Sequence, residues 1–495
     1  MAFWPKGLIR TSPPTGIDAV RARYSVQFKR LGAAPAGISF TQDQLGPLPG
    51  EWARGAKSDA GRVILYFHGG GFVAGSPQTH RGLSGRLVEA SGVAAFCLRY
   101  RLAPECSFPA AVRDGIDAYR ALLAKGLPGC SIVLAGDLVL DEPDAPYWLD
   151  GIAPAVRAAD LAIGHLEVPH TARGAEMEGD VPAPGAPPEN IAAIAGAGFT
   201  MVSLAGNHIA DCGAEGIADT LAGLDAHGIA HAGAGLTLAE AREPAVVDRS
   251  GRRIALLSYN CVGPESAWAG PDRAGCAWLP IETADGSPVA PAANLVALTD
   301  AAVAILREDI ARARAMADLV LVALHKGIVH TPARLALYER AVSHAAIDAG
   351  ADVVIGHHAH IVRGIEFYRG KPVFHGLGNG CVVTRALSPA QDHPARREWA
   401  QRRKALFGFE PDPAYTLAPF HPQAVNAFLG RIDWGADGAI VPAIIPVDVE
   451  APGRPVLAPP DRAAEIRAYV DGITRDAGMP GIRIDADGRV QEVAA

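Results

Sequence analysis

Short apolar runs alternate with amphipathic segments along the first part of the chain. Apolar runs at 63–67, 94–98 and 131–135 are separated by segments with helical spacing at 84–90 and 110–125. Buried strands that alternate with helices are typical of a parallel sheet that helices cover on both faces. We therefore predict a doubly wound α/β sheet for this part of the chain.

The same alternation continues beyond residue 137 with longer intervals. The runs 245–247 and 254–257 flank a polar turn and predict a hairpin, and 261–294 is expected to form a long ordered loop. Polar residues cluster where the strands end, which is where α/β proteins place their chemistry. Strands are predicted at 161–164, 200–204, 254–258, 319–323, 353–356 and 373–375, and helices at 145–158, 189–197, 215–227, 295–317 and 333–349.

Composition excludes several classes of protein. The 495 residues are 49% hydrophobic and 20% charged, which suits several globular domains, and the formal net charge of −8 without a basic block argues against a nucleic-acid binder. Seven scattered cysteines argue against a disulfide scaffold or a thiolate zinc site. Because no apolar stretch has the length of a signal peptide or a membrane span, we expect a cytoplasmic protein without a transmembrane anchor.

A glycine-rich loop follows the first predicted strand. Its residues are His68, Gly69, Gly70 and Gly71. Glycines without Cβ atoms allow backbone N–H groups to approach a developing oxyanion. With Tyr100–Glu105 and Asp114, this loop resembles the hormone-sensitive-lipase group of carboxylesterases over about 60–137, which implies a partial α/β-hydrolase sheet.

The nucleophile that this resemblance requires is missing. In that group the next strand leads into a serine within Gly-Asp-Ser-Ala-Gly, but here Gly136-Asp137 is followed by Leu138, and no G-x-S-x-G motif occurs in the chain. We therefore interpret the glycine-rich loop as a vestigial oxyanion loop.

A second series of polar residues begins at Asp137. Carboxylate, amide oxygen and imidazole together suit manganese, iron or zinc, and a bridging carboxylate can hold two ions at once. In a strand, His358 and His360 would share a face, with His357 opposite. The series consists of Asp137; His165 and Glu167; Asn207, His208 and Asp211; His325 and Lys326; and His357, His358 and His360.

This series, with Asp318–His325, Ile347–Asp352 and Gly376–Asn379, resembles the CapA family over about 132–450. CapA proteins are poly-γ-glutamate capsule biosynthesis proteins within the calcineurin-like metallophosphoesterases. The resemblance implies a metallophosphoesterase-like αββα sandwich, an α/β fold, preceded by the partial doubly wound α/β-hydrolase sheet. It also implies two divalent metal ions and a link to an anionic γ-glutamyl polymer.

The resemblance assigns a role to each motif residue. Asn207, His325 and His358 would complete the ligand set of one ion. Asp137, the first-strand ligand, and Glu167, the bridging carboxylate, would serve the other ion with His360. His208 would act as an acid or anion stabiliser, oriented by Asp211.

Some positions depart from the family pattern. Val139 stands where many metallophosphoesterases have a histidine, so that one ion is expected to be held loosely or to be absent. His165 replaces an asparagine and is interpreted as an added ligand, a substrate contact or a hydrogen-bonding core residue. Lys326 replaces a tryptophan, and we interpret it as a contact to an anionic substrate or as a solvated lysine; His357 is a further candidate for substrate contact.

The two resemblances meet on Ala135-Gly136-Asp137. One strand cannot occupy the centre of two sheets, so we hypothesise a fusion in which this strand serves the metal domain. The truncated sheet would then expose an edge, through which a homo-oligomer could form. The expected domains are 1–130, 131–450 with an insertion at 382–425, and a C-terminal extension at 451–495 that packs on the metal domain.

The sequence thus favours a metal-dependent hydrolase of the CapA type. It would act on a phosphoester or amide in an anionic small molecule or polymer. One alternative is an accessory protein that binds a capsule polymer or a partner in the same cleft without turnover. A carboxylesterase is the second and disfavoured alternative.

Overall fold

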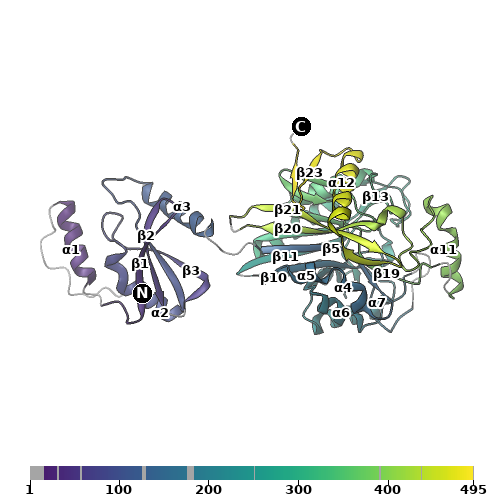
Figure 1. Cartoon of the computed structure of the whole chain (residues 1–495), viewed down its shortest axis with the longest axis horizontal. Coiled ribbons are helices and arrows are strands. Elements are labelled where there is room, and N and C mark those ends of the chain that lie inside the picture. The colour runs from purple at the N-terminus through teal and green to yellow at the C-terminus, as the bar shows by residue number, and fades with distance from the viewer. Residues whose placement is uncertain are drawn as a thin grey trace. The chain divides into compact units, whose positions relative to one another are not determined.

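The computed structural model describes residues 16–29, 33–55, 58–124, 130–175, 183–249, 251–388, 392–435 and 437–493. The chain divides into two compact units, coloured from purple to yellow along the sequence in Figure 1. Unit 1 comprises Met1–Gly129 with Gly435–Gly438, and unit 2 comprises Cys130–Trp434 with Ala439–Ala495. The start of the chain, on which the absence of a signal peptide rests, lies outside the described residues.

Unit 1 contains a four-stranded sheet of order β1-β2-β4-β3. Only the pair β3 and β4 is parallel, whereas β1–β2 and β2–β4 are antiparallel. The elements are α1 (Ile17–Lys29), β1 (Ile38–Leu45), β2 (Leu48–Gly55), β3 (Asp59–Phe67), a 3₁₀ turn (Gln78–His80), α2 (Arg81–Ser91), β4 (Val93–Leu98) and α3 (Ala110–Ala124).

The sequence analysis predicted no strand before residue 63, so the antiparallel strands β1 and β2 were missed, whereas the predicted parallel pair is present as β3 and β4. Strand β1 carries the polar run Thr41–Gln44, whose side chains are exposed, so it lacks the apolar signal of a buried strand. The core of the sheet is formed by Leu45, Trp52, Phe96 and Leu98.

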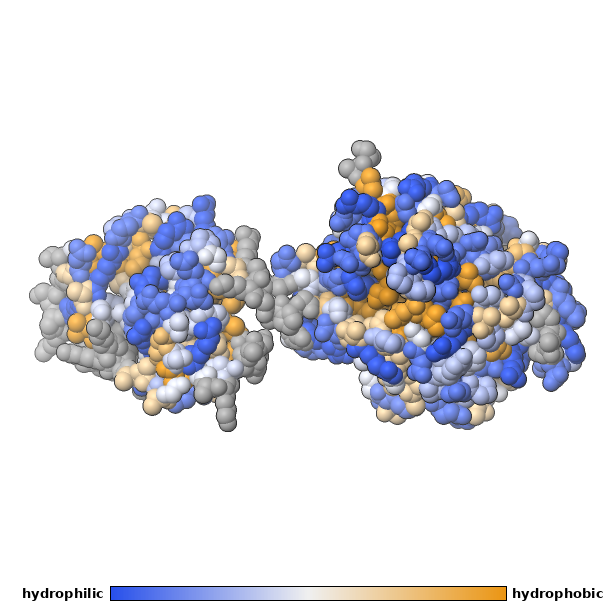
Figure 2. All heavy atoms as spheres, viewed as in Figure 1, coloured by the Kyte–Doolittle hydropathy of each residue, from blue (hydrophilic) through white to orange (hydrophobic). Residues whose placement is uncertain are grey.

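Strand β3 lies at one edge of this sheet. Beside it, Phe67, Phe72, Val112 and Tyr119 are large apolar side chains that remain exposed, and they line an open pocket of about 800 Å³ with the glycine-rich loop. Hydrophobic residues, drawn in orange, reach the surface of unit 1 in Figure 2. An exposed sheet edge is what we expected from a truncated hydrolase sheet. The association of two copies of the chain through this edge stays a prediction.

Unit 2 is built on two sheets. The larger has the order β22-β21-β20-β5-β6-β7-β8, with β19 paired to β5, and the other has the order β10-β11-β15-β16-β18-β17. The larger sheet contains β5 (Cys130–Leu140), β6 (Leu161–Leu166), β7 (Met201–Ser203), β8 (Ala230–Ala232), β19 (Asn379–Val383), β20 (Asn426–Trp434), β21 (Ile440–Glu450) and β22 (Arg454–Leu457). The six-stranded sheet contains β10 (Ala245–Arg249), β11 (Arg252–Asn260), β15 (Leu319–His325), β16 (Val353–His357), β17 (Ile365–Tyr368) and β18 (Lys371–Phe374).

Alternating side chains hold these two sheets face to face. In β5, Ile132 and Leu134 join the buried cluster that contains Leu319 and Leu321 of β15, whereas Val133 joins a second cluster that contains helix residues. Because successive side chains of a strand point to opposite faces, both sheets can bury one face against each other and the other against helices. This arrangement confirms the predicted αββα sandwich.

Helices and short strands complete unit 2. Helix α9 contacts β11 and β15, α10 contacts β16, and α12 contacts β20 and β21. The helices are α4 (Ala145–Asp150), α5 (Ala153–Arg157), α6 (Asn190–Ala197), α7 (Gly213–Ala226), α8 (Leu238–Ala241), α9 (Asp300–Met316), α10 (Leu337–Asp348), α11 (Pro394–Phe407) and α12 (Pro460–Asp476), with 3₁₀ turns at Glu265–Ala267 and Pro422–Val425. The remaining strands are β9 (Ala234–Gly235), β12 (Gly275–Cys276), β13 (Ile281–Thr283), β14 (Leu295–Leu298), β23 (Ile482–Ile484) and β24 (Val490–Glu492).

Several predicted boundaries in unit 2 are wrong. The helix predicted at 295–317 begins only at Asp300, because Thr299 accepts a hydrogen bond from the Ala302 amide as an N-cap and 295–298 pair with β13. The helix predicted at 145–158 is divided into α4 and α5. The predicted hairpin is confirmed as β10 and β11.

Strand β5 belongs to unit 2. It pairs in parallel with β6 and β19 and antiparallel with β20, and Asp137 lies opposite both His165 and Asn379. The structure therefore supports the hypothesis that the shared strand serves the metal domain. Residues beyond 450 supply β22, α12, β23 and β24 to the same unit, and their treatment as a separate extension stays a prediction.

Among the described residues, no helix combines the length and the apolar character that crossing a bilayer requires.

We predict that Gly136→Ala destabilises the chain by about 1–3 kcal/mol, because a Cβ at this position would lie 1.9 Å from the Gly378 carbonyl oxygen. Urea denaturation of the full chain measures the change. Gly196→Ala in α6 is the matched control, since its Cβ would meet no atom within 4 Å and alanine favours helix by about 1 kcal/mol. Equal stability of Gly136→Ala and the natural chain would contradict the close packing of this backbone.

Candidate metal centre

The predicted polar residues converge where strands of the two sheets end. Asp137 lies opposite His165 in the larger sheet, and His325 lies opposite His357 in the six-stranded sheet. Parallel strands bring their carboxyl ends to one edge, so β5, β6, β15 and β16 present these side chains together. The buried core between the sheets fixes the position of each strand end.

One group of possible ligands consists of Asp137, Glu167 and His360. One ligand atom of each lies within 4.8 Å of the others. His360 Nδ1 is 3.4 Å from Asp137 Oδ2, and His360 Nε2 is 3.4 Å from Glu167 Oε1. Both carboxylates are almost completely buried, with exposures of 0% and 1%. This is the set that the family resemblance implied for one ion.

A second group shares Asp137. It consists of Asp137, His165 and His325, whose ligand atoms also lie within 4.8 Å of one another. Asn207 Oδ1 is 2.7 Å from His325 Nε2, and His358 Nδ1 is 3.2 Å from the same nitrogen. The structure thus brings Asn207, His325 and His358 together as expected and adds His165 to them.

The residues present fit divalent cations. Within the described part of the chain, several buried atoms at the centre have no hydrogen-bond partner, and leaving such an atom unsatisfied costs about 1–3 kcal/mol. Carboxylate and imidazole atoms that converge in this way are suitable cation ligands. The atoms are both carboxylate oxygens of Asp137 and of Glu167, His165 Nε2, His325 Nδ1 and His358 Nε2.

Burial shifts the pKa values of the histidines and carboxylates at the centre in different directions. Burial lowers the pKa of His165 and of His358 to about 3, and it lowers the pKa of His325 well below its usual value, so these imidazoles are neutral and able to ligate. Burial opposes the charge of Asp137, but the contacts with His357 and His360 lower the pKa of Asp137 overall. Burial raises the pKa of Glu167 to about 7.

His357, His358 and His360 do not lie in one strand, as the sequence analysis had predicted. Strand β16 ends at His357, and both His358 (φ 87°) and His360 (φ 52°) adopt left-handed backbone conformations beyond it. His357 therefore does not point to the opposite face: its Nδ1 lies 3.3 Å from Asp137 Oδ1, and its ring stacks on His165 at 4.6 Å. His357 is buried behind the ligands, so its predicted substrate contact is corrected to a contact with Asp137.

His165 is likewise removed from substrate. Its side chain is buried, its Nδ1 lies 3.0 Å from Ser203 Oγ, and its Nε2 has no hydrogen-bond partner among the described residues. The interpretation as a ligand oriented by a hydrogen bond fits this geometry better than the interpretation as a substrate contact.

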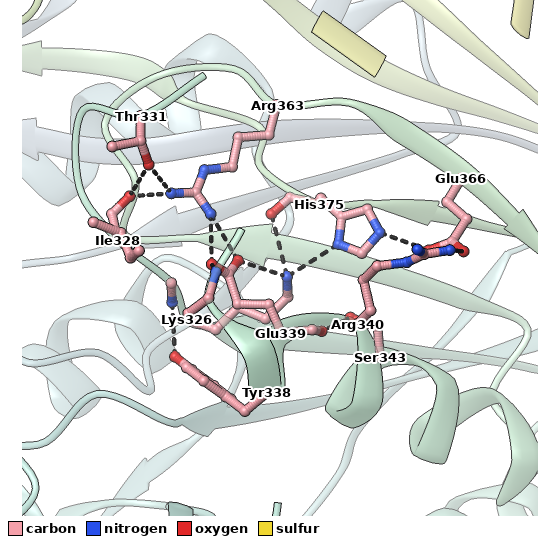
Figure 3. Close-up of polar contacts among 12 residues, drawn as sticks. Lys326, Ile328, Thr331, Tyr338, Glu339, Arg340, Ser343, Arg363, Glu366 and His375 are labelled. Atoms are coloured by element: carbon pink, nitrogen blue, oxygen red, sulfur yellow. Dashed lines mark hydrogen bonds and ion pairs between the residues drawn. The ribbon is translucent and has the colours of Figure 1, made fainter. Parts of the chain in front are cut away.

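Lys326 does not face the substrate side. Figure 3 shows its ammonium among Glu339, Arg363 and His375. Lys326 Nζ is 3.3 Å from both Glu339 Oε2 and His375 Nδ1, and burial lowers the pKa of Lys326 despite the nearby Glu339 carboxylate. Both predicted roles, substrate contact and solvated lysine, are therefore corrected to a buried ion pair.

The same network supports the loop that follows β15. Arg363 donates to both Glu339 carboxylate oxygens at 2.7 and 2.9 Å, to Thr331 Oγ1 at 2.9 Å and to the Ile328 carbonyl. Since Ile328 and Thr331 line the cleft described next, this buried network shapes the cleft from behind.

An open cleft of about 740 Å³ leads to the residues of the candidate metal centre. Asn207, His208, His358 and His360 line it at the centre. His208 Nδ1 is 2.7 Å from Asp211 Oδ2, so the carboxylate orients the ring as the sequence predicted.

The sequence analysis assigned no individual role to two residues at the centre. Asn379 ends the motif Gly376–Asn379; its Oδ1 is 3.0 Å from His360 Nδ1, and it lies beside Asp137 in the sheet. His330 lines the cleft with a left-handed backbone (φ 59°) and donates its amide to the Ala359 carbonyl. It lies in a loop, where no strand-end pattern marks it.

Comparison with known protein families agrees with this geometry. The model of the family described as bacterial capsule synthesis protein PGA_cap matches residues 131–382, about half of the chain. The chain belongs to the PGA_cap family. A second model, the alpha/beta hydrolase fold, matches residues 64–138. The two matches overlap on β5, which confirms the fusion inferred from the sequence.

Curated relatives of the PGA_cap segment include two bacterial proteins. A protein named probable polyglutamine synthesis accessory protein, from Mycobacterium tuberculosis (strain ATCC 25618 / H37Rv), is 34% identical over 239 residues, which cover 47% of this chain and 59% of that protein. The PGA biosynthesis protein CapA of Bacillus subtilis (strain 168) is 27% identical over 262 residues, covering 52% and 63% respectively.

The segment before β5 has a different relative. An acetyl-hydrolase of Streptomyces hygroscopicus is 46% identical over 110 residues, which cover 22% of this chain and 35% of that protein. The chain therefore spans less than two thirds of the length of each of these three relatives.

We predict that cation binding releases a proton from Glu167, because burial raises the pKa of Glu167, whereas burial already keeps His165 and His358 neutral. Affinity for Mn²⁺ should therefore fall from pH 8 to pH 6, by up to about tenfold per pH unit below the Glu167 pKa. Calorimetric titration in buffers of different ionisation enthalpy measures the released proton. Glu167→Gln should bind more weakly and lose this pH dependence, and equal Mn²⁺ affinity of the natural chain at both pH values would refute the assignment.

We also predict that Lys326→Met lowers stability by about 3 kcal/mol, since it removes one partner of a buried ion pair. Urea denaturation measures this change. Lys404→Met is the control, because its pair with Glu410 is exposed and should contribute less than about 1 kcal/mol. Weaker substrate binding by Lys326→Met at unchanged stability would instead restore the role of a substrate contact.

Proposed function

We propose that this PGA_cap protein is a metal-dependent hydrolase of a phosphoester or amide bond in an anionic, capsule-related substrate. The supporting observation is the pair of ligand groups that share Asp137, next to an open cleft that Asn207, His358 and His360 line. Their buried oxygen and nitrogen atoms lack hydrogen-bond partners among the described residues, which favours cations as their natural partners.

The proposed centre holds two divalent ions, of manganese, iron or zinc. Asp137, Glu167 and His360 would hold one ion, and His325, Asn207 and His358 would hold the other, with His165 as an additional ligand. Bound cations would supply Lewis-acid polarisation of the phosphoryl or carbonyl oxygen of a substrate.

The remaining steps belong to the protein itself. His208 lines the cleft, and its Nδ1 contact with Asp211 orients the imidazole ring. From this position His208 can transfer a proton to the leaving group or bind its negative charge. Asn379 restrains the ring of His360, and the buried position of Asp137 and Glu167 keeps bulk water from screening the charges at the centre.

A second candidate is an accessory role without turnover. The name of the relative from Mycobacterium tuberculosis, an accessory protein, favours it. In that role the same cleft would bind a polymer or a partner protein. A carboxylesterase has less support, since β5 lies in the sandwich of unit 2 and carries Leu138 in place of the serine.

We predict metal-dependent turnover that His208→Ala and Glu167→Ala reduce by about a hundredfold or more. Suitable substrates are bis-p-nitrophenyl phosphate, p-nitrophenyl phosphate and γ-glutamyl-p-nitroanilide, assayed with elemental analysis of each protein. His227→Ala is the control, because His227 is an exposed residue at the end of α7.

Loss of metal should accompany loss of activity in Glu167→Ala, whereas His208→Ala should retain its metal. A natural chain that retains metal but turns over none of the three substrates would favour the accessory role. Metal-independent cleavage of short acyl esters would favour the carboxylesterase.

A further inference from the structure

Two chemically different groups of residues line the cleft. One consists of ligand residues and His208, and the other belongs to α11 in the insertion at 382–425. Trp399, Arg402, Leu406 and Phe407 of α11 line the cleft. The helix lies at one end of unit 2 in Figure 1. We call this part of the cleft lining the α11 wall.

The α11 wall is anchored to the metal centre. Arg403 is buried and donates to the carbonyl oxygens of Pro419 and Leu387, each at 2.6 Å. From the same insertion, Phe420 stacks on the His360 ring with a centroid distance of 5.0 Å. Phe407 packs edge-on against His330 at 4.8 Å. The position of the wall is therefore coupled to the ligand residues.

Two arginines of the cleft remain unpaired. Arg402 precedes the buried Arg403, yet its side chain is exposed toward the cleft, and Arg334 in the loop before α10 is exposed there too. Neither guanidinium forms a hydrogen bond or ion pair with a described residue. By contrast, the exposed Arg173 and Arg101 have carboxylate partners within 3.0 Å.

Acidic residues do not balance these two charges. None of the described residues that line the cleft is an aspartate or a glutamate, although the chain as a whole carries a net charge of −8. An unpaired guanidinium presents a planar fork of donors that matches a carboxylate or a phosphate. In the same lining, Trp399 and Leu406 offer apolar surface for the uncharged part of a ligand.

We propose that the α11 wall and Arg334 form a binding site for a polyanion, a chain with repeated carboxylate or phosphate groups. Arg402 and Arg334 bind anionic groups beyond the reacting bond, while that bond lies beside His208. This inference rests on the proposed function for the location of the bond, and it identifies Arg402 and Arg334 as specificity-determining residues.

Binding to the full, metal-loaded chain tests the proposal independently of turnover. The probes are a pentaglutamate peptide for carboxylate, a thymidine pentanucleotide for phosphate and a pentaglutamine peptide as the neutral reference, titrated calorimetrically at low ionic strength. The double variant Arg334→Gln/Arg402→Gln should bind one or both anions about tenfold or more weakly, and its pentaglutamine affinity should not change. The anion that responds identifies the source of the charge.

Arg397→Gln is the matched control, since Arg397 is exposed on the same helix and does not line the cleft. It should bind both anions within about twofold of the natural chain, because a remote exposed charge contributes little. Unchanged anion affinity in the double variant, or an equal loss in Arg397→Gln, would overturn the proposal. Absence of turnover in the natural chain, with the affinity loss intact, would count against the hydrolase and not against the polyanion site.

Discussion

The structure of unit 2 depends on burying two carboxylates among apolar strands without protein partners for all their oxygens. An isolated buried charge is costly, and breaking a buried pair costs about 3–5 kcal/mol. Asp137 lies within β5 and Glu167 directly follows β6, two strands whose apolar side chains are buried in the core of unit 2. Imidazoles that burial keeps neutral surround them. A positive charge at this place offsets the cost of burying the carboxylates, which links the fold to the proposed chemistry.

Much of the architecture could be predicted because its physical signals are local. Apolar runs marked most central strands, and polar residues directly after them marked the centre. The signal failed where burial is partial: β1 presents the polar run Thr41–Gln44, and β14 resembles the first turn of α9 until Thr299 is recognised as a cap. Alternation along one strand also failed at His357, because the backbone leaves the strand there and enters left-handed conformations.

The side-chain directions at the site could not be predicted for a related reason. Lys326 follows a ligand, and a lysine is expected in solvent, but Glu339 and Arg363 from distant segments create a buried polar cavity for it (Figure 3). His330 and Asn379 join the site through contacts between loops and sheets that no spacing in the sequence encodes. Polar residues at strand ends in the sequence thus predict the candidate ligands, whereas the residues that surround the ligands depend on tertiary contacts.

The place of β5 has a consequence for synthesis on the ribosome. Unit 1 emerges first, with β3 at its edge, and β5 follows it directly, whereas β20, which borders β5 in the finished sandwich, is translated much later. The parallel partner β6, by contrast, follows β5 closely in the chain, so the parallel half of the larger sheet can form before its antiparallel half has been synthesised.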